Sequence, residues 1–269
     1  LRRELERGAY TRPTGVAHHL RGFAALRRAK GLVEEGRLGR IVQYRIGYYH
    51  SSMLDPERSW GWKHGERGGS IFDLGSHLFD LVDWLVGSPA SVLATTQTLH
   101  TRRPAGQETR DVVAEDSFAV LTRGIQGVDD GTSRSSVLGV VEATKLMNGM
   151  EDEMKVEIGG ERGSLRFSLM SPHYLEFFDA TDRGGALGGE SGWKQIASGA
   201  RYESPECDFP SGKSTTGWVR GHVASLASYY AGIAGGSTYT PDLRQGLKVL
   251  RTLFAVQESS RERRWVEVR

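Results

Sequence analysis

The sequence contains a single cysteine, Cys207, among its 269 residues. One cysteine excludes an intrachain disulfide framework and a cysteine-based zinc site, and it favours a reducing compartment. No apolar run reaches the roughly 18 residues that a membrane-spanning helix needs, and no signal peptide is visible. We therefore expect a cytoplasmic protein that does not bind in a membrane.

Charge of one sign is not in excess either, because 35 Lys and Arg residues against 33 Asp and Glu residues give a net charge of +2. Nucleic acid is therefore not expected as a partner. The sequence also lacks a P-loop, a G-x-S-x-G motif and a G-x-G-x-x-G motif after a strand. Gly184, Gly185, Gly188 and Gly189 have neither a preceding strand nor a following helix, so no complete dinucleotide site is visible.

The most informative stretch runs from 67 to 90 and predicts a helix with both ends marked. Ser70 is a plausible N-cap with Asp73 three residues on, and Gly87 and Pro89 follow the predicted end. Apolar side chains cover more than half of the circumference, which indicates a mostly buried helix. These side chains are Phe72, Leu74, Leu78, Phe79, Leu81, Val82, Leu85 and Val86.

The remaining side of this helix carries Asp73, His77, Asp80 and Trp84, at spacings of four, three and four. Burying ionisable groups unpaired would cost several kcal/mol, so we expect them to face a partner, a cavity or a cleft. Asp73 and His77 are the candidate catalytic pair, in which the carboxylate orients the imidazole and His77 moves a proton near neutral pH.

A structural alternative stays open for the same two residues. Asp73 could simply be the acid of a capping box, and an Asp and a His four positions apart could be a modest helix-surface pair. As metal ligands they would need a third group from elsewhere, and no spacing selects one, so we predict no metal site.

Other candidates for ligand contact lie before the helix. Trp62 and Lys63 belong to a polar, aromatic loop that could contact a sugar-like ligand, although a packed loop anchor is the alternative. Arg21 could bind a ligand hydroxyl or carboxylate, and its alternative is an ordinary surface charge. Together with Asp80, these residues form the predicted substrate-binding set.

The rest of the chain predicts an α+β fold: a large, mainly antiparallel open β-sheet with helices packed on one face. Consecutive strands without helices between them favour antiparallel pairing. Strands are predicted at 41–49, 91–98, 116–122, 136–146, 154–158, 164–168, 174–178 and 265–268, with a possible one at 14–21. Helices are predicted at 22–35, at 219–232 and after an N-cap at Thr240, and a long loop at 181–216.

The segment Gly68-Gly-Ser-Ile-Phe-Asp-Leu-Gly-Ser-His-Leu-Phe-Asp80 resembles the G-G-G-x-x-x-D-x-G-x-H-x-x-D signature of the glucose–fructose oxidoreductase / inositol dehydrogenase (Gfo/Idh/MocA) family. The segments 29–41, 141–144, 158–165 and 242–260 resemble further parts of its substrate domain, in the same order. The resemblance implies NAD(P)-dependent oxidation of a sugar or polyol hydroxyl, or the reverse reduction. His77 would be the general acid/base, and Asp73 would orient it or bind an adjacent hydroxyl.

Two departures from the family pattern shape this prediction. The family's Rossmann domain, with its glycine fingerprint and its E-K-P lysine, is missing, so residues 1–14 are interpreted as its remnant and 15–269 as the substrate-binding and oligomerisation domain. Of the Asn-Tyr-Arg-like segment, only Arg21 is kept. We therefore expect no turnover by this chain alone, NAD or NADP as the cofactor of the whole enzyme, and a homo-oligomer formed through the open sheet face.

Rival functions remain at this stage. The chain could be a non-catalytic sugar-binding or dimerisation module, or a metal-dependent hydrolase that uses Asp73 and His77. Glycoside hydrolysis assisted by a bound nicotinamide, known from some members of the family, is a further possibility. The sequence does not identify the sugar, the reaction direction or the choice between NAD and NADP.

Overall fold

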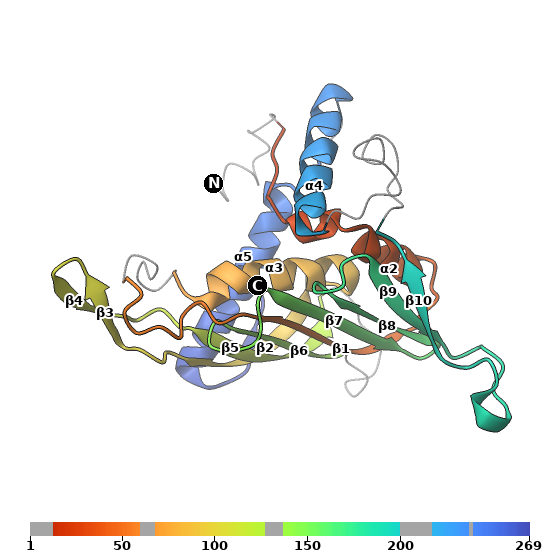
Figure 1. Ribbon diagram of the computed structural model, residues 1–269, viewed down its shortest axis with the longest axis horizontal. Helices are drawn as coiled ribbons and strands as arrows, with labels where there is room; N and C mark the ends of the chain where they lie inside the picture. Colours follow the sequence, from red (N-terminus) through yellow and green to blue (C-terminus); the bar gives the residue numbers. More distant parts are fainter. Residues whose placement is uncertain (1–12, 60–67, 127–136, 200–216, 237–238) are drawn as a thin grey trace.

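A computed structural model describes residues 13–59, 68–126, 137–199, 217–236 and 239–269 (Figure 1). Its α-helices are α2 (Ala24–Glu34), α3 (Ser70–Leu85), α4 (Gly217–Ala234) and α5 (Leu243–Glu262), and its 3₁₀ helices are η1 (His19–Gly22) and η4 (Ala186–Gly188). Within these residues, no helix is long and apolar enough to cross a membrane. The predicted domain boundary at residue 14 is not tested, because residues 1–12 lie outside the described part.

Nine strands form one large sheet in the order β10-β9-β8-β7-β1-β6-β5-β2-β11. Their bounds are β1 (Ile41–Tyr49), β2 (Pro89–Gln97), β5 (Ser117–Ile125), β6 (Leu138–Thr144), β7 (Glu153–Gly160), β8 (Gly163–Ser168), β9 (Tyr174–Asp179), β10 (Trp193–Ala197) and β11 (Val266–Glu267). All neighbouring pairs are antiparallel except β1 and β6. The prediction of a large, mainly antiparallel sheet is confirmed.

The strands alternate between buried and more exposed residues, as one covered and one open face require. In β5, for example, Phe118, Val120 and Thr122 are buried while Ala119 and Leu121 are exposed. In Figure 1, α2, α3 and α4 lie on the same side of the sheet, and α5 runs beside α3 and the β2 edge. The hydrophobic core lies between this sheet face and the helices.

Helix α4 extends away from the sheet and is anchored mainly through η1 (Figure 1). The two backbones touch at a pair of glycines: a Cβ added to Gly22 would lie 2.2 Å from the carbonyl oxygen of Gly221. A side chain at Gly22 would therefore push the helices apart. The segment before η1 is also held from the far end of the chain, because the Val16 amide donates to the carbonyl of Pro241 at 2.9 Å.

Several local predictions are wrong. Residues 14–21 contain no strand and instead end in η1, and the predicted loop at 181–216 contains β10, which pairs with β9. Helix α5 is capped by Asp242 rather than Thr240, because the Asp242 side chain accepts from the amides of Arg244 and Gln245.

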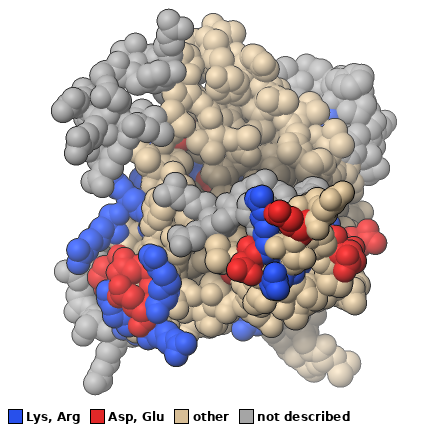
Figure 2. Space-filling view, turned by 90° about the vertical axis from the view of Figure 1, so that its left-hand side faces the viewer, with Lys and Arg blue, Asp and Glu red and all other residues tan. Residues whose placement is uncertain are grey.

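A two-stranded hairpin, β3 (Arg102–Ala105) and β4 (Glu108–Asp111), was not predicted. It projects from one end of the molecule, and Figure 2 views that end. Charged side chains of both signs gather there, including the pair Arg102–Asp111 at 3.5 Å. The base of the hairpin is held by the fully buried Arg103, whose guanidinium donates to the carbonyls of Met53 and Asp55. The hairpin thereby fixes the segment that follows β1.

Candidate active site

Helix α3 begins at Ser70, and a carboxylate from a distant segment caps it. The N-cap residue is Gly69, and the amide of Ile71 donates to Glu115 Oε1 at 2.7 Å while the Ser70 amide donates to the Glu115 carbonyl at 3.0 Å. A Cβ at Gly69 would lie 2.2 Å from Glu115 Oε1, so glycine is needed for this approach. The predicted capping box of Ser70 and Asp73 is therefore wrong.

The polar side of α3 does face other elements, as predicted. Asp73 pairs with Lys145, His77 contacts two histidines before and within η1, and Asp80 and Trp84 both meet Arg21. The opposite side packs into the core through Ile71, Leu74, Leu78, Leu81 and Leu85. The helix thus presents its functional candidates along one line.

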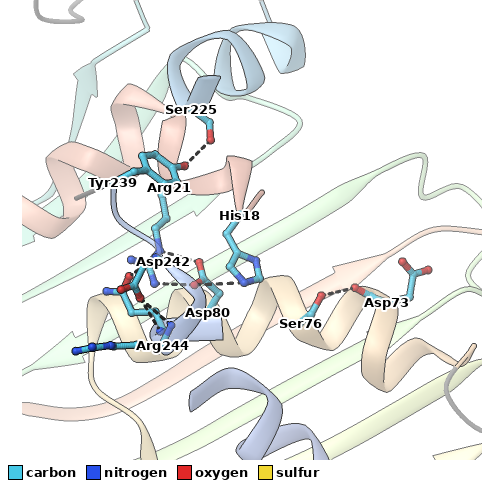
Figure 3. Close-up of polar contacts among 10 residues, drawn as sticks. His18, Arg21, Asp73, Ser76, Asp80, Ser225, Tyr239, Asp242 and Arg244 are labelled. Carbon is cyan, nitrogen blue, oxygen red and sulfur yellow. Dashed lines mark hydrogen bonds and ion pairs between the residues drawn. The ribbon is translucent and has the colours of Figure 1, made fainter. Parts of the chain in front are cut away.

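Asp80 and Arg21 form a buried, bidentate ion pair. Arg21 Nε and Nη2 donate to the two carboxylate oxygens at 2.8 and 2.6 Å, and their side chains are 8% and 1% exposed (Figure 3). His18 Nε2 lies 3.7 Å from the same carboxylate. Burial raises the pKa of Asp80 to about 6, and Arg21 opposes this rise. Arg21 and Asp80 already form hydrogen bonds with each other. Substrate contact by either residue therefore stays a prediction.

Asp73 lies in the first turn of α3, before Asp80, and points away from the Asp80 pair (Figure 3). Its Oδ2 accepts from Lys145 Nζ, on the residue directly after β6. The Asp73 side chain is 55% exposed, whereas that of Lys145 is only 6% exposed. Sequence reasoning missed Lys145, because no local pattern signals a partner 72 residues away.

His77 lies in a cluster of four imidazoles. Its ring packs edge-on against those of His18 and His19, with centroids 5.7 and 5.3 Å away. His19 in turn stacks on His222 of α4, with ring centroids 3.8 Å apart. The ring of Trp218 packs against His222 with centroids 4.2 Å apart. One nitrogen of each histidine is buried and unpartnered in the structure. The cluster therefore offers free hydrogen-bonding capacity beside His77.

These imidazoles are neutral at neutral pH. Burial, with the neighbouring imidazoles, lowers the pKa of His18 and that of His19 to about 3. Burial also lowers the pKa of His77, and the Asp73 charge opposes this effect. A neutral His77 can accept a proton. Asp73 acts on it through its charge, since the hydrogen bond of Asp73 goes to Lys145.

Two further polar residues, Tyr48 and His50, lie on the Lys145 side of the site. Burial and the neighbouring Asp152 carboxylate raise the pKa of Tyr48, which keeps its hydroxyl protonated. Burial and Lys145 lower the pKa of His50. Tyr48 lies in the last part of β1 and His50 directly follows the strand, so the sheet supplies one wall of the site and α3 the other.

Two predicted ligand contacts, Trp62 and Lys63, lie outside the described residues. Among the residues that the structure does describe, no three His, Cys, Asp or Glu side chains are placed to hold one metal ion. The polar groups around His77 can all hydrogen-bond to a hydroxyl: neutral imidazoles, paired carboxylates that accept, and a buried ammonium group that donates. They suit an uncharged hydroxylated ligand better than a metal.

A protein-family model described as "Oxidoreductase family, C-terminal alpha/beta domain" (Gfo/Idh/MocA) matches residues 30–268. Among curated proteins, levoglucosan dehydrogenase of Pseudarthrobacter phenanthrenivorans is 25% identical over 261 residues, covering 94% of this chain and 66% of its own. D-xylose dehydrogenase of Paenarthrobacter nicotinovorans is 29% identical over 161 residues, covering 56% of this chain and 39% of its own. The chain thus spans less than two thirds of the length of these relatives.

Solved structures agree with the sequence relatives. Levoglucosan dehydrogenase in complex with NADH and L-sorbose superposes with a TM-score of 0.83 and 25% identity, covering 96% of this chain and 66% of that one. An NAD-binding oxidoreductase from Klebsiella pneumoniae gives a TM-score of 0.86 and 25% identity, covering all of this chain and 69% of that one. The mixed sheet with its helices is therefore the fold of this oxidoreductase domain.

Proposed function

Because this chain belongs to the Gfo/Idh/MocA oxidoreductase family, we propose that it is the substrate-binding part of an NAD(P)-dependent dehydrogenase or reductase for a sugar or polyol hydroxyl. The observation that carries the proposal is His77, a neutral imidazole held on a buried helix beside a half-exposed carboxylate. Such a group can accept the hydroxyl proton when the alcohol is oxidised and return it on reduction.

The roles of the other residues follow from their contacts. Asp73 supports the imidazolium that forms when His77 takes the proton, or binds an adjacent hydroxyl. The neutral imidazoles of His18, His19 and His222 can share hydrogen bonds with further hydroxyls, and Trp218 offers an aromatic face to sugar C–H groups. Trp62 and Lys63 remain candidate ligand contacts.

The described residues supply no phosphate-binding glycine loop between a strand and a helix, so they do not fit the dinucleotide itself. We infer that residues beyond this substrate domain hold it, and that the 269-residue chain does not turn over alone. When bound, a nicotinamide accepts or donates the hydride. Structures of relatives in complex with NADH support NAD(H) rather than an unrelated cofactor.

The test begins with the coding sequence upstream of Leu1. If it encodes a strand–GxGxxG–helix unit and an E-K-P lysine, the extended protein is assayed with NAD⁺ and NADP⁺ against levoglucosan, D-xylose and inositols. We expect sugar-dependent NADH or NADPH formation by the extended protein and none by the present chain. His77→Gln should lower kcat by about 10²- to 10⁴-fold. An unaffected His77→Gln variant would contradict the base role.

A non-catalytic sugar-binding or dimerisation module is the second candidate, because the unpartnered imidazole nitrogens around His77 can bind hydroxyls without any redox step. A start codon at or just before Leu1, together with sugar binding but no redox activity, would support it. Saturation-transfer NMR on the 269-residue chain measures that binding directly.

We further propose that the open sheet face mediates self-association. Leu121 and Leu138 are 41% and 49% exposed there, on the adjacent strands β5 and β6, and the half-buried Val140 pairs with Leu121 on the same face. Exposed apolar side chains grouped in this way support an interface on this face. Leu121→Arg should shift the mass measured by light scattering toward the monomer, and Leu187→Arg, a control at an exposed position of η4, should not.

A further inference from the structure

Lys145 is a buried lysine that the family signature does not include. Its side chain is 6% exposed, and its amine donates to Asp73. Its backbone is fixed as well: its amide donates to the carbonyl of Asp116 at 3.0 Å, and its carbonyl accepts from the amide of Met53 at 2.9 Å. A long, flexible side chain is held in one place here, and its buried ammonium depends on the Asp73 carboxylate to offset the cost of desolvation.

The partner of Lys145 is the residue that most directly influences His77 from its own helix. Asp73 precedes His77 by four positions, on the same face. Other charged or titratable groups also act on His77: His18 and His19 from the η1 segment, His222 from α4, and Asp152 from the segment between β6 and β7. Asp152 is already engaged with the Tyr48 hydroxyl.

We propose that Lys145 is a positioning residue that holds the Asp73 carboxylate beside His77 and limits how strongly this carboxylate attracts a proton to the imidazole. The proposal rests on the base role of His77 in the proposed function. A carboxylate with its counter-ion in place creates a weaker negative potential than a free one. Lys145 therefore weakens the one charge on α3 that opposes the effect of burial on His77, yet leaves Asp73 close enough to support the imidazolium afterwards.

The test is a pH titration of the histidine rings by ¹H–¹⁵N NMR, on the 269-residue chain with labelled histidine. His77→Gln assigns the His77 signal. Lys145→Met should raise the His77 pKa by about 0.5–1, and Asp73→Asn should lower it by a similar amount. Lys145→Arg, which keeps the charge, should stay close to the wild type.

Two controls separate positioning from unfolding or a remote effect. The exposed Lys155 on β7 carries the same charge, and Lys155→Met should leave the His77 titration unchanged. The ring of His100, which is within hydrogen-bonding distance of the Leu54 carbonyl at 3.0 Å, reports that the fold is intact. An unshifted His77 in a folded Lys145→Met variant would overturn the proposal. The proposal would also be overturned if Lys145→Met raised the His77 pKa as much in the Asp73→Asn background as in the wild type. Lys145 would then act independently of Asp73.

This measurement needs no cofactor and no turnover, so it can fail separately from the proposed function. The expected shifts without dehydrogenase activity in the extended protein would support the Lys145 assignment and contradict the proposed function. Activity together with an unshifted His77 would support the function and overturn the role of Lys145.

Discussion

Two aspartates lie seven positions apart on one face of α3, and each is paired with a basic side chain from another segment. Asp80 and Arg21 are both almost fully buried, whereas Asp73 is half exposed above a buried Lys145. The same local pattern thus produces a closed pair at one end of the helix and an open pair at the other. Burial, not residue type, separates the two pairs, and in the proposed function the open pair is the one that acts beside the ligand.

The difference comes from what covers each pair. The η1 segment lies over Asp80, contributes Arg21, and brings His18 to 3.7 Å. Nothing comparable among the described residues covers Asp73, whose free side remains open to solvent. Reaction with a substrate needs such an open side, so the comparison supports the proposed chemistry at the Asp73 and His77 end, and ligand contact by Arg21 and Asp80 stays a prediction.

The largest expected effect is loss of the closed pair. Arg21→Met leaves the Asp80 carboxylate buried without its bidentate partner, and we expect it to lower the free energy of unfolding by about 3–5 kcal/mol. Chemical denaturation at pH 7 measures this. The matched control is Arg28→Met at the exposed Arg28–Glu35 pair, which should change stability little.

The same variant has a signature in pH. Without Arg21 the pKa of Asp80 should rise further in the folded state. The folded state is then stabilised when Asp80 is protonated, because the unfolded chain holds that proton less tightly. The stability difference between Arg21→Met and the wild type should therefore shrink when the pH falls from 8 to 5. A difference that does not change with pH would show that lost packing, including the contact with Trp84, matters more than the charge.

The second effect concerns the histidines at the closed end. His18 and His19 have folded pKa values of about 3, below the ordinary 6.5, so the unfolded chain binds more protons between these values. The contribution of these two histidines to stability is then fully present above about pH 6.5, and it decreases as the pH falls toward 3. The expected slope is up to about 1.4 kcal/mol per pH unit for each histidine. Unfolding curves at pH 7 and pH 5 measure it, and a His18→Leu/His19→Phe variant should flatten it.

A third, smaller effect tests the N-terminal end of α3. Glu115→Ala removes the carboxylate that caps the Ile71 amide, and we expect a loss of about 1–2 kcal/mol in unfolding free energy. Glu115→Gln keeps an acceptor oxygen and should lose less. Equal losses in both variants would indicate that the negative charge at the helix N-terminus, rather than the hydrogen bond, provides the stabilisation.

The sequence alone predicts α3 and its polar line well, because helical periodicity is a local property. It cannot show that Asp80 meets Arg21 while Asp73 meets Lys145, since these partners are 59 and 72 residues away. The capping role of Glu115 is missed for the same reason. The short strands of the β3–β4 hairpin and β10 are missed because they are four or five residues long and lack a clear apolar alternation.

The smallest expected effect comes from a direct comparison of the two aspartates, in which each is replaced by asparagine. Asp73→Asn leaves the buried Lys145 ammonium with a neutral acceptor oxygen, but solvent reaches the pair from the half-exposed Asp73 side, so we expect the unfolding free energy to fall by only about 1 kcal/mol. Asp80→Asn places a neutral amide against the buried Arg21 guanidinium and should cost several times more. Both variants are measured by denaturation under identical conditions. Equal costs would mean that the two pairs are structurally equivalent, and the site would then have to be distinguished by His77 alone.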